Sequence, residues 1–148
     1  MIVLSHRAAL ALAAVVDIAM HSRPLPVAAK ALASRLDLPP RHLETLLQAL
    51  VRGNILKGLR GPRGGYELAR ERRKITAGAV LRAIAGEGAH QDEASGGDLL
   101  KQVIAPMIES AGAAFLKELD DVTVEDICQK AEGLRPAGRD DAEGDFAI

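Results

Sequence analysis

Aromatic residues and cysteines are scarce in this sequence, and each scarcity excludes a class of protein. Phe, Trp and Tyr together make up 2% of the 148 residues, and Trp is absent. Binders of single-stranded nucleic acid stack bases on aromatic side chains, so this composition argues against that class. The single cysteine, Cys128, excludes an internal disulfide framework and an all-cysteine zinc site within one chain. It fits a reducing cytoplasm, where we expect the protein to reside.

Long hydrophobic runs and enzyme motifs are also missing. His6, Arg7 and Asp17 interrupt the apolar N-terminal stretch, and no run reaches the ~18–20 residues that a membrane span needs. A secretory signal is a weak match to this stretch, and a buried amphipathic helix explains it better. The sequence offers no Ser/His/Asp set, no phosphate-binding loop and no paired-carboxylate signal. We therefore expect neither a membrane protein nor an enzyme.

Charge is divided unevenly between the two halves of the chain. Up to Gly86 there are 14 Lys and Arg against 5 Asp and Glu, a balance of +9. From Glu87 onward there are 5 against 15, a balance of -10. A basic half followed by an acidic half predicts a polyanion-binding domain joined to a region that repels polyanions.

Apolar residues recur at helical spacing along most of the chain, which predicts a mainly α protein. Polar residues that cap helices precede several of these stretches, and Pro106 predicts a kink or a late start in the longest one. The expected helices are Ser5 (as cap) to about His21, Val27–Leu36, Pro39 or Pro40 to about Arg52, Thr76 (as cap) to about Ala85, Asp98 (as cap) to about Leu119, and Val124 to about Ala131.

The second and third expected helices form a helix-turn-helix pattern, because a tight turn at Asp37–Pro40 joins them. In such motifs the start of the second helix contacts base edges in the major groove of DNA. Arg can pair with guanine and Glu can accept from cytosine. A solvated helix end would carry similar residues, so the pattern alone leaves both interpretations open. The candidate residues at this helix start are Arg41, His42, Glu44 and Thr45.

A hairpin follows, with strands expected at Ile55–Leu59 and Tyr66–Leu68 and a turn of sequence RGPRGG between them. Arg60 and Arg63 on this narrow turn can enter a minor groove, where A·T tracts concentrate negative potential. The alternative is a hairpin whose arginines only keep it soluble. Directly after a helix-turn-helix in a basic half, the first interpretation is favoured, and the hairpin is then the wing of a winged helix-turn-helix.

We also expect contacts to the DNA backbone around the helix start and the hairpin turn. Gly64 and Gly65 lack side chains, so phosphate can approach their backbone closely. Ser5 and Arg7 at the start of the first helix can contact phosphate, and Lys57 at the start of the hairpin belongs to the same predicted surface.

The long helix carries an apolar stripe at close to heptad spacing, which is typical of a helix that packs against a second helix. Its members are Leu100, Val103, Ile104, Met107, Ile108, Ala111, Phe115 and Leu119. We expect this stripe to mediate dimerisation.

The segments LSHRAALAL, PRHLETLLQALVRGNIL, KGLRGPRGGYELA and ITAGAVLRAIAGE occur in an order that resembles the Rrf2 family of bacterial winged-helix repressors. The resemblance is close from Leu4 to Glu87 and looser through AFLKELDDVTVEDI. It implies a homodimer that crosses its long helices and binds palindromic double-stranded DNA. It also implies that Glu44 and Thr45 contact the major groove with Arg41 nearby, and that Arg60 contacts the minor groove.

The chain departs from the family pattern at three places. Arg63 replaces a glycine of the common RGPGGGY motif, and Thr45 stands where glutamine is frequent. Many members carry three cysteines before the long helix that ligate an iron–sulfur cluster, whereas the corresponding loop here, GEGAHQDEASGGD, has none. Because such clusters need thiolate ligands, we expect no cofactor of this kind.

Other sensing chemistry stays open. His90, Asp92 and Glu93 offer ligands to a harder metal, although a mobile acidic loop explains them more simply. Cys128 is a candidate redox sensor, but apolar burial in a helix is the better interpretation. The candidate signals are therefore a small molecule, a protein partner, the redox state of Cys128 and a metal.

The sequence thus predicts a mainly α fold with a small two-stranded antiparallel wing and four regions. These are a winged helix-turn-helix DNA-binding domain at 1–86, a flexible acidic loop at 87–97, a dimerisation helix and short terminal helix at 98–132, and a disordered tail at 133–148. The leading hypothesis is a homodimeric repressor. The alternative is a partner-controlled adaptor whose dimerisation region engages a metabolic enzyme.

Overall fold

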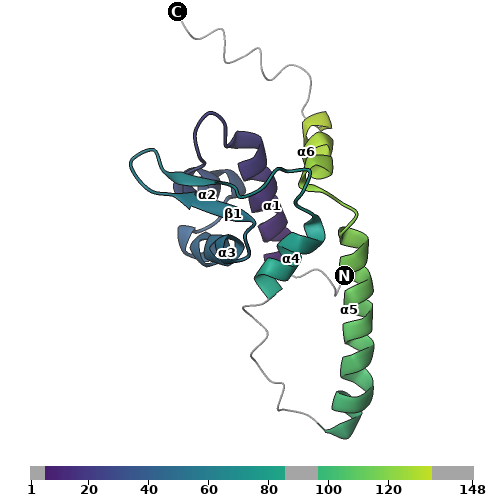
Figure 1. The fold of residues 1–148 in the computed structure, drawn as a ribbon. Coiled ribbons are helices and arrows are strands. Elements are labelled where there is room, and N and C mark those ends of the chain that lie inside the picture. Colours follow the sequence, from purple (N-terminus) through teal and green to yellow (C-terminus); the bar gives the residue numbers. More distant parts are fainter. Residues whose placement is uncertain (1–5, 86–96, 135–148) are drawn as a thin grey trace, which may run out of the picture.

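A computed structural model describes residues 6–85 and 97–134 (Figure 1). Six α-helices and one two-stranded antiparallel sheet are present in these ranges, which confirms the predicted fold class. The helices are α1 (His6–His21), α2 (Ala29–Leu36), α3 (Pro40–Arg52), α4 (Ala77–Ala85), α5 (Ala105–Leu119) and α6 (Val124–Gly133), and the strands are β1 (Leu56–Leu59) and β2 (Gly65–Leu68). A π-helical segment, η1 (Leu100–Ile104), precedes α5.

The core is built around α1, which packs against α2, α3, α4, α6 and β2. Its buried face is formed by Ala8, Ala11, Ala14, Val15 and Ile18. Small alanine side chains let neighbouring helices approach closely, and branched aliphatic residues from α3 and α4 fill the remaining space. Among the described residues, the buried core contains no aromatic side chain, and it is closely packed because the helices lie near one another.

The helix-turn-helix forms as predicted, with one correction at the start of α2. The turn is closed at Asp37, which adopts a left-handed conformation (φ 53°), and Pro40 opens α3 at a favoured first-turn position. The second helix was predicted to begin at Val27, but α2 begins at Ala29. Val27 is extended and pairs with Tyr66 of the wing. Its side chain is buried in the core, and a buried valine fits an extended segment as well as a helix, so the apolar pattern does not distinguish them.

The helix α3 ends at Gly53–Asn54, and Asn54 rather than the glycine adopts the left-handed conformation. Gly53 has an ordinary φ of -79°, and Asn54 takes the left-handed conformation at φ 58°. The amide of Ile55 then donates to the carbonyl of Leu50 at 2.9 Å, which satisfies a free carbonyl at the helix end.

The long helix differs from its prediction at the start. Asp98 was expected to act as the cap, but it is the first helical residue, and the amide of Lys101 donates to Gly97 at 3.1 Å. The π-helical turn η1 lies directly before Pro106. Proline lacks an N–H and its ring clashes with the carbonyl four residues back. Widening the preceding turn to an i→i+5 bond, as between Leu100 and Ala105, accommodates the ring without ending the helix.

The apolar stripe of the long helix divides between two environments. Phe115 and Leu119 are half-buried and pack against the core of their own chain. By contrast, Val103, Met107 and Ile108 are 54%, 60% and 61% exposed, although they are large and apolar. Leu100 and Ala111 are also exposed, and Ile104 is half-buried. One continuous stripe in the sequence is therefore two surfaces in the structure.

The predicted cap at Thr76 is present, since its hydroxyl accepts from the amide of Ala79 at 3.0 Å. Thr123 and Asp126 form a reciprocal capping box at the start of α6. Ser5, the acidic loop except Gly97, and the tail beyond Leu134 lie outside the described residues. None of the described helices combines the length and apolarity that crossing a membrane requires.

Candidate nucleic-acid interface

At the start of α3, apolar side chains face the core and polar side chains face solvent. Leu43, Leu46, Leu47 and Leu50 are buried, whereas Arg41, His42, Glu44 and Thr45 are exposed. No side chain caps the helix, because Pro39 occupies the cap position. Pro40 has no amide hydrogen and the His42 amide donates to the Pro39 carbonyl at 3.2 Å, so the positive end of the helix dipole is what remains available to an anion. The helix presents one polar face at its positive end.

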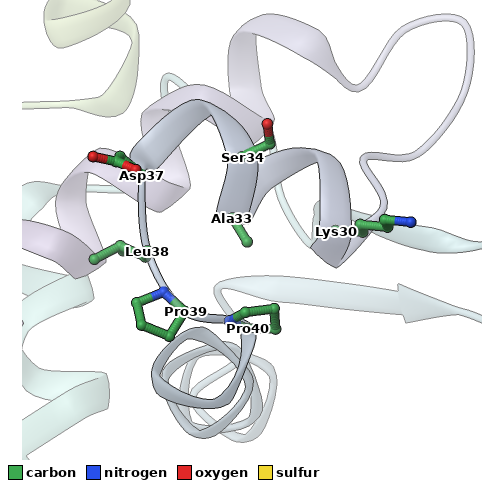
Figure 2. Close-up of a pocket in the computed structure, with 7 residues that line it drawn as sticks. All are labelled: Lys30, Ala33, Ser34, Asp37, Leu38, Pro39 and Pro40. Carbon is green, nitrogen blue, oxygen red and sulfur yellow. The ribbon is translucent and has the colours of Figure 1, made fainter.

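A hollow of about 550 Å³ lies between α2 and the start of α3. Figure 2 shows Ala33 pointing from α2 toward Pro39 and Pro40, with Lys30 and Asp37 at opposite ends. Lys30 is exposed and was not singled out from the sequence. It is four residues before Ser34, so both lie on one face of α2 beside the start of α3. That spacing could have identified Lys30 as part of this surface.

The wing presents its arginines at the tip. Arg60, Pro62 and Arg63 are exposed, and the turn is closed by a hydrogen bond from the Gly64 amide to the Gly61 carbonyl at 2.9 Å. Within the described residues, no ion pair or hydrogen bond of the side chain engages Arg60 or Arg63. In Figure 1 the hairpin and α3 lie on the same side of α1, opposite α5. The structure therefore brings the α3 and wing candidates to one side.

The other candidates do not all join this surface. Lys57 forms a cross-strand ion pair with Glu67, with 3.7 Å between Nζ and Oε1. Arg7 lines a hollow of about 520 Å³ together with residues of α4 and α5, such as Leu81 and Glu109. Ser5 is not described.

The glycines of the wing are required by the chain's own backbone. A Cβ on Gly64 would lie 2.2 Å from the carbonyl oxygen of Leu59. A Cβ on Gly65 would lie 2.4 Å from that of Val27. Arg63 has no positive φ, so a side chain is tolerated at this position of the turn. The predicted close approach of phosphate is thus not needed to explain Gly64 and Gly65.

Two hydrogen bonds join the wing to the helix-turn-helix. The Val27 amide donates to the Tyr66 carbonyl at 2.9 Å, and the Tyr66 amide donates to the Val27 carbonyl at 2.8 Å. Val27 lies two residues before the first residue of α2, with Ala28 at the cap position between them. The wing is therefore linked to the segment that leads into the DNA-binding helices.

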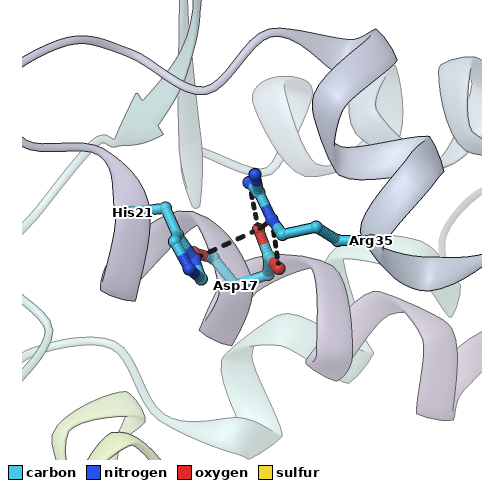
Figure 3. A network of polar contacts seen from close by, with 3 residues as sticks. All are labelled: Asp17, His21 and Arg35. Carbon is cyan, nitrogen blue, oxygen red and sulfur yellow. Dashed lines mark hydrogen bonds and ion pairs between the residues drawn. The ribbon is translucent and has the colours of Figure 1, made fainter. Parts of the chain in front are cut away.

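A second connection joins α2 to α1 (Figure 3). The Arg35 guanidinium donates to both carboxylate oxygens of Asp17, with Nη2 at 2.7 Å from Oδ1 and Nε at 2.9 Å from Oδ2. The ring of His21 approaches the same carboxylate at 3.6 Å. The hydrogen bonds with Asp17 raise the pKa of Arg35. This bidentate pair fixes the orientation of α2 on α1.

Metal and thiol chemistry has little support among the described residues. No group of three His, Cys, Asp or Glu side chains in these ranges is close enough to hold a metal ion. Cys128 on α6 is fully buried, as the apolar interpretation predicted. The structure places Arg72 against this thiol. The hydrogen bond to Cys128 raises the pKa of Arg72, and Glu125 adds to the effect.

We expect Gly65→Ala to destabilise the protein by about 1–3 kcal/mol, because the new Cβ forces the Val27 carbonyl away and breaks the pair with Tyr66. Gly58→Ala is the matched control, since its Cβ would meet only the Tyr66 ring at 3.9 Å. Urea unfolding followed by circular dichroism measures both. Equal unfolding midpoints for the two variants would show that the close approach at Gly65 is unimportant.

Residues 4–130 of the chain match the Rrf2 family, described as "Iron-dependent Transcriptional regulator". The HTH-type transcriptional regulator IscR of Pectobacterium carotovorum is 26% identical over 138 residues, covering 90% of this chain and 83% of the relative. An HTH-type transcriptional regulator of Synechocystis is 39% identical over 71 residues, which is 48% of each chain.

Solved structures agree with this assignment. The structure of T. potens IscR has a TM-score of 0.68 and 29% identity, covering 90% of this chain and 92% of that one. CymR, the global cysteine regulator of B. subtilis, has a TM-score of 0.65 and 27% identity, covering 88% and 98%.

The chain belongs to the Rrf2 family and is a DNA-binding transcriptional regulator with a winged-helix fold. Its relatives are transcriptional regulators and not enzymes, as the sequence analysis predicted.

Proposed function

We propose that this Rrf2-family protein is a homodimeric repressor that binds a palindromic operator, with α3 in the major groove and the wing in the minor groove. One observation carries the proposal: Arg60 and Arg63 are exposed at the wing tip without an ion-pair partner among the described residues, and the wing lies on the same side of α1 as α3. Unpaired cations keep their full charge for phosphate or a groove edge.

In this proposal the start of α3 determines which bases are preferred. Glu44 and Thr45 face base edges, and Arg41 and His42 flank them. Glu is suited to accept from cytosine N4, and a threonine methyl can contact the methyl group of thymine. The short Thr45 side chain reaches less far than glutamine, so the preferred operator differs from that of relatives with glutamine there.

The wing supplies the minor-groove contact. Arg60 inserts into the groove, where a narrow A·T tract has enhanced negative potential. Arg63 contacts the flanking phosphate. Gly64 and Gly65 hold the tip against Leu59 and Val27, and backbone approach to phosphate is a secondary role for them.

Several cations contact phosphates around these two elements and add affinity without sequence preference. Lys30 on α2 joins this group because it is exposed beside the start of α3. Lys57 contributes less, because Glu67 neutralises part of its charge. Ser5 and Arg7, at the start of α1, contact the DNA backbone only if the DNA extends beyond the surface formed by α3 and the wing.

A second copy of the chain covers the exposed apolar part of the long helix. Leu100, Val103, Met107 and Ile108 form this face, with Ala111 beside them. Large apolar side chains exposed along one helix mark an interaction surface. Phe115 and Leu119 instead anchor the helix to its own DNA-binding domain. We assign residues 98–132 to the dimerisation region and residues 1–86 to the DNA-binding domain. The predicted tail at 133–148 begins too early, because Gly133 is the last residue of α6.

Operator binding places the protein in the cytoplasm. A small molecule or a protein partner controls it.

We also propose that the protein holds no iron–sulfur cluster of the cysteine-ligated kind, because its one cysteine is fully buried on α6. Purification without oxygen, an absorbance spectrum and iron analysis measure this. We expect no visible-region chromophore and no stoichiometric iron. A brown protein with bound iron would refute the proposal.

Arg60→Gln should weaken operator binding about tenfold or more, since it removes a desolvated groove contact. The operator is first selected from random duplexes with the wild-type protein, and affinity is then measured by fluorescence anisotropy. Arg73→Gln is the charge-matched control, because Arg73 lies at the base of the wing and pairs with Glu71 at 3.3 Å. It should bind nearly as the wild type does.

The same titrations at several salt concentrations should show steep loss of wild-type affinity, as counterion release requires. Binding that ignores salt, or Arg60→Gln binding as tightly as Arg73→Gln, would contradict the proposed contacts.

Val103→Glu should convert the protein to a monomer, because a carboxylate in a packed apolar face is left unpaired. Gln102→Glu adds the same charge at the neighbouring exposed position and should remain dimeric. Sedimentation equilibrium reports the mass of each, and circular dichroism checks that both are folded. A monomeric wild type, or an unchanged Val103→Glu dimer, would exclude this face as the interface.

A further inference from the structure

A polar hollow of about 720 Å³ lies at the base of the wing. One wall is the end of α1 and the turn after it, including Met20, Ser22 and Arg23. The other wall is the end of β2 and the connector that follows, from Glu67 to Arg72. Figure 1 shows this connector passing across α1 toward α6. Elements that are far apart in sequence therefore enclose one site.

Three arginines, from two of these segments, line the hollow. Arg23 belongs to the turn after α1, and Arg70 and Arg72 to the connector. Arg70 donates from Nε to the carbonyl of Asn54 at 3.4 Å, and Arg72 pairs through Nε with Glu125 at 3.0 Å. Within the described residues Arg23 has no ion-pair partner, and neither Nη group of Arg70 has an acceptor. These donors are therefore available to a ligand.

The two acidic residues of the lining do not cancel this charge. Glu67 pairs with Lys57, and Glu71 pairs with Arg73. Neither Lys57 nor Arg73 lines the hollow. Because Arg72 is already matched by Glu125, the balance inside the hollow is the charge of Arg23 and Arg70. The C-terminal end of α1 carries about half a negative elementary charge, which repels an anion. The two positive charges of Arg23 and Arg70 outweigh this repulsion.

We propose that this hollow binds a small multivalent oxyanion, a metabolite that carries phosphate or several carboxylate groups. Arginine forks bind such groups through paired N–H···O contacts. The volume suits a metabolite rather than a single water-sized ion. The site lies one strand length from the wing tip, about 13 Å for four residues, so it is separate from the DNA contacts proposed for Arg60 and Arg63.

A ligand here bridges the end of α1 to the segment that supports the wing. The connector also continues to Cys128 and Glu125 of α6 through Arg72. Anion binding at this hollow does not depend on the proposed DNA-binding role.

The test uses the full chain without DNA, titrated calorimetrically with inorganic pyrophosphate and with citrate at constant ionic strength in chloride. We expect saturable binding of one anion per chain. Arg23→Gln combined with Arg70→Gln should weaken the affinity about tenfold or more, since charge-assisted contacts are lost. Arg73→Gln removes one charge from the same connector outside the hollow and should bind as the wild type does.

Three results would overturn the proposal. The first is binding of neither probe above the chloride background. The second is equal weakening by Arg73→Gln, which would indicate a general charge effect. The third is retained binding in the double variant, whose folding is checked by its melting curve without anion.

A DNA arm distinguishes a free anion from DNA phosphate. Under the proposal, the double variant binds the selected operator with wild-type affinity when no anion is added. A loss as large as that of Arg60→Gln would assign the hollow to the DNA backbone and overturn the metabolite site. Failure of the proposed operator contacts would appear separately, as unchanged DNA binding by Arg60→Gln with the anion titration unaffected.

Discussion

Close packing on the alanine face of α1 is the constraint on which the rest of the structure depends. Ala11 and Ala14 are fully buried, and helices from both ends of the chain contact this one helix. Because their side chains end at Cβ, the neighbouring backbones approach and bring leucine and valine side chains into contact across α1. The helix-turn-helix, the wing and the terminal helix therefore share a single core, and larger residues on this face would separate all of them at once.

Local patterns were sufficient to predict the elements of the fold. Leu43, Leu46, Leu47 and Leu50 define the buried face of α3 by spacing alone, and the RGPRGG turn locates the wing. The pairing of Val27 with Tyr66, the Arg35–Asp17 pair and the position of Arg72 at Cys128 were not predicted. Each joins residues distant in sequence, and no period or motif in one sequence specifies such contacts.

The candidate site, like the fold, was predictable from the sequence only in its local features. The candidates on α3 and at the wing tip are exposed, as expected for side chains whose charge or polarity a core does not accommodate, and their contacts to DNA stay a prediction. It could not show that Lys57 is paired or that Lys30 lies beside the helix start. It also could not divide the apolar stripe of the long helix, because Phe115 and Val103 are equally apolar and differ only in their neighbours.

The wing tip is held in place by backbone contacts at Gly64 and Gly65, whereas its arginines make no contact that positions it. The residues that fix the shape of the wing tip are thus different from the residues that give it its charge. Arg60, Pro62 and Arg63 can be exchanged during evolution without rebuilding the turn, and Arg63 already stands where related sequences often have glycine. Operator preference can therefore diverge through the tip residues at little cost to folding, whereas a side chain at Gly64 or Gly65 would meet backbone atoms of the same chain.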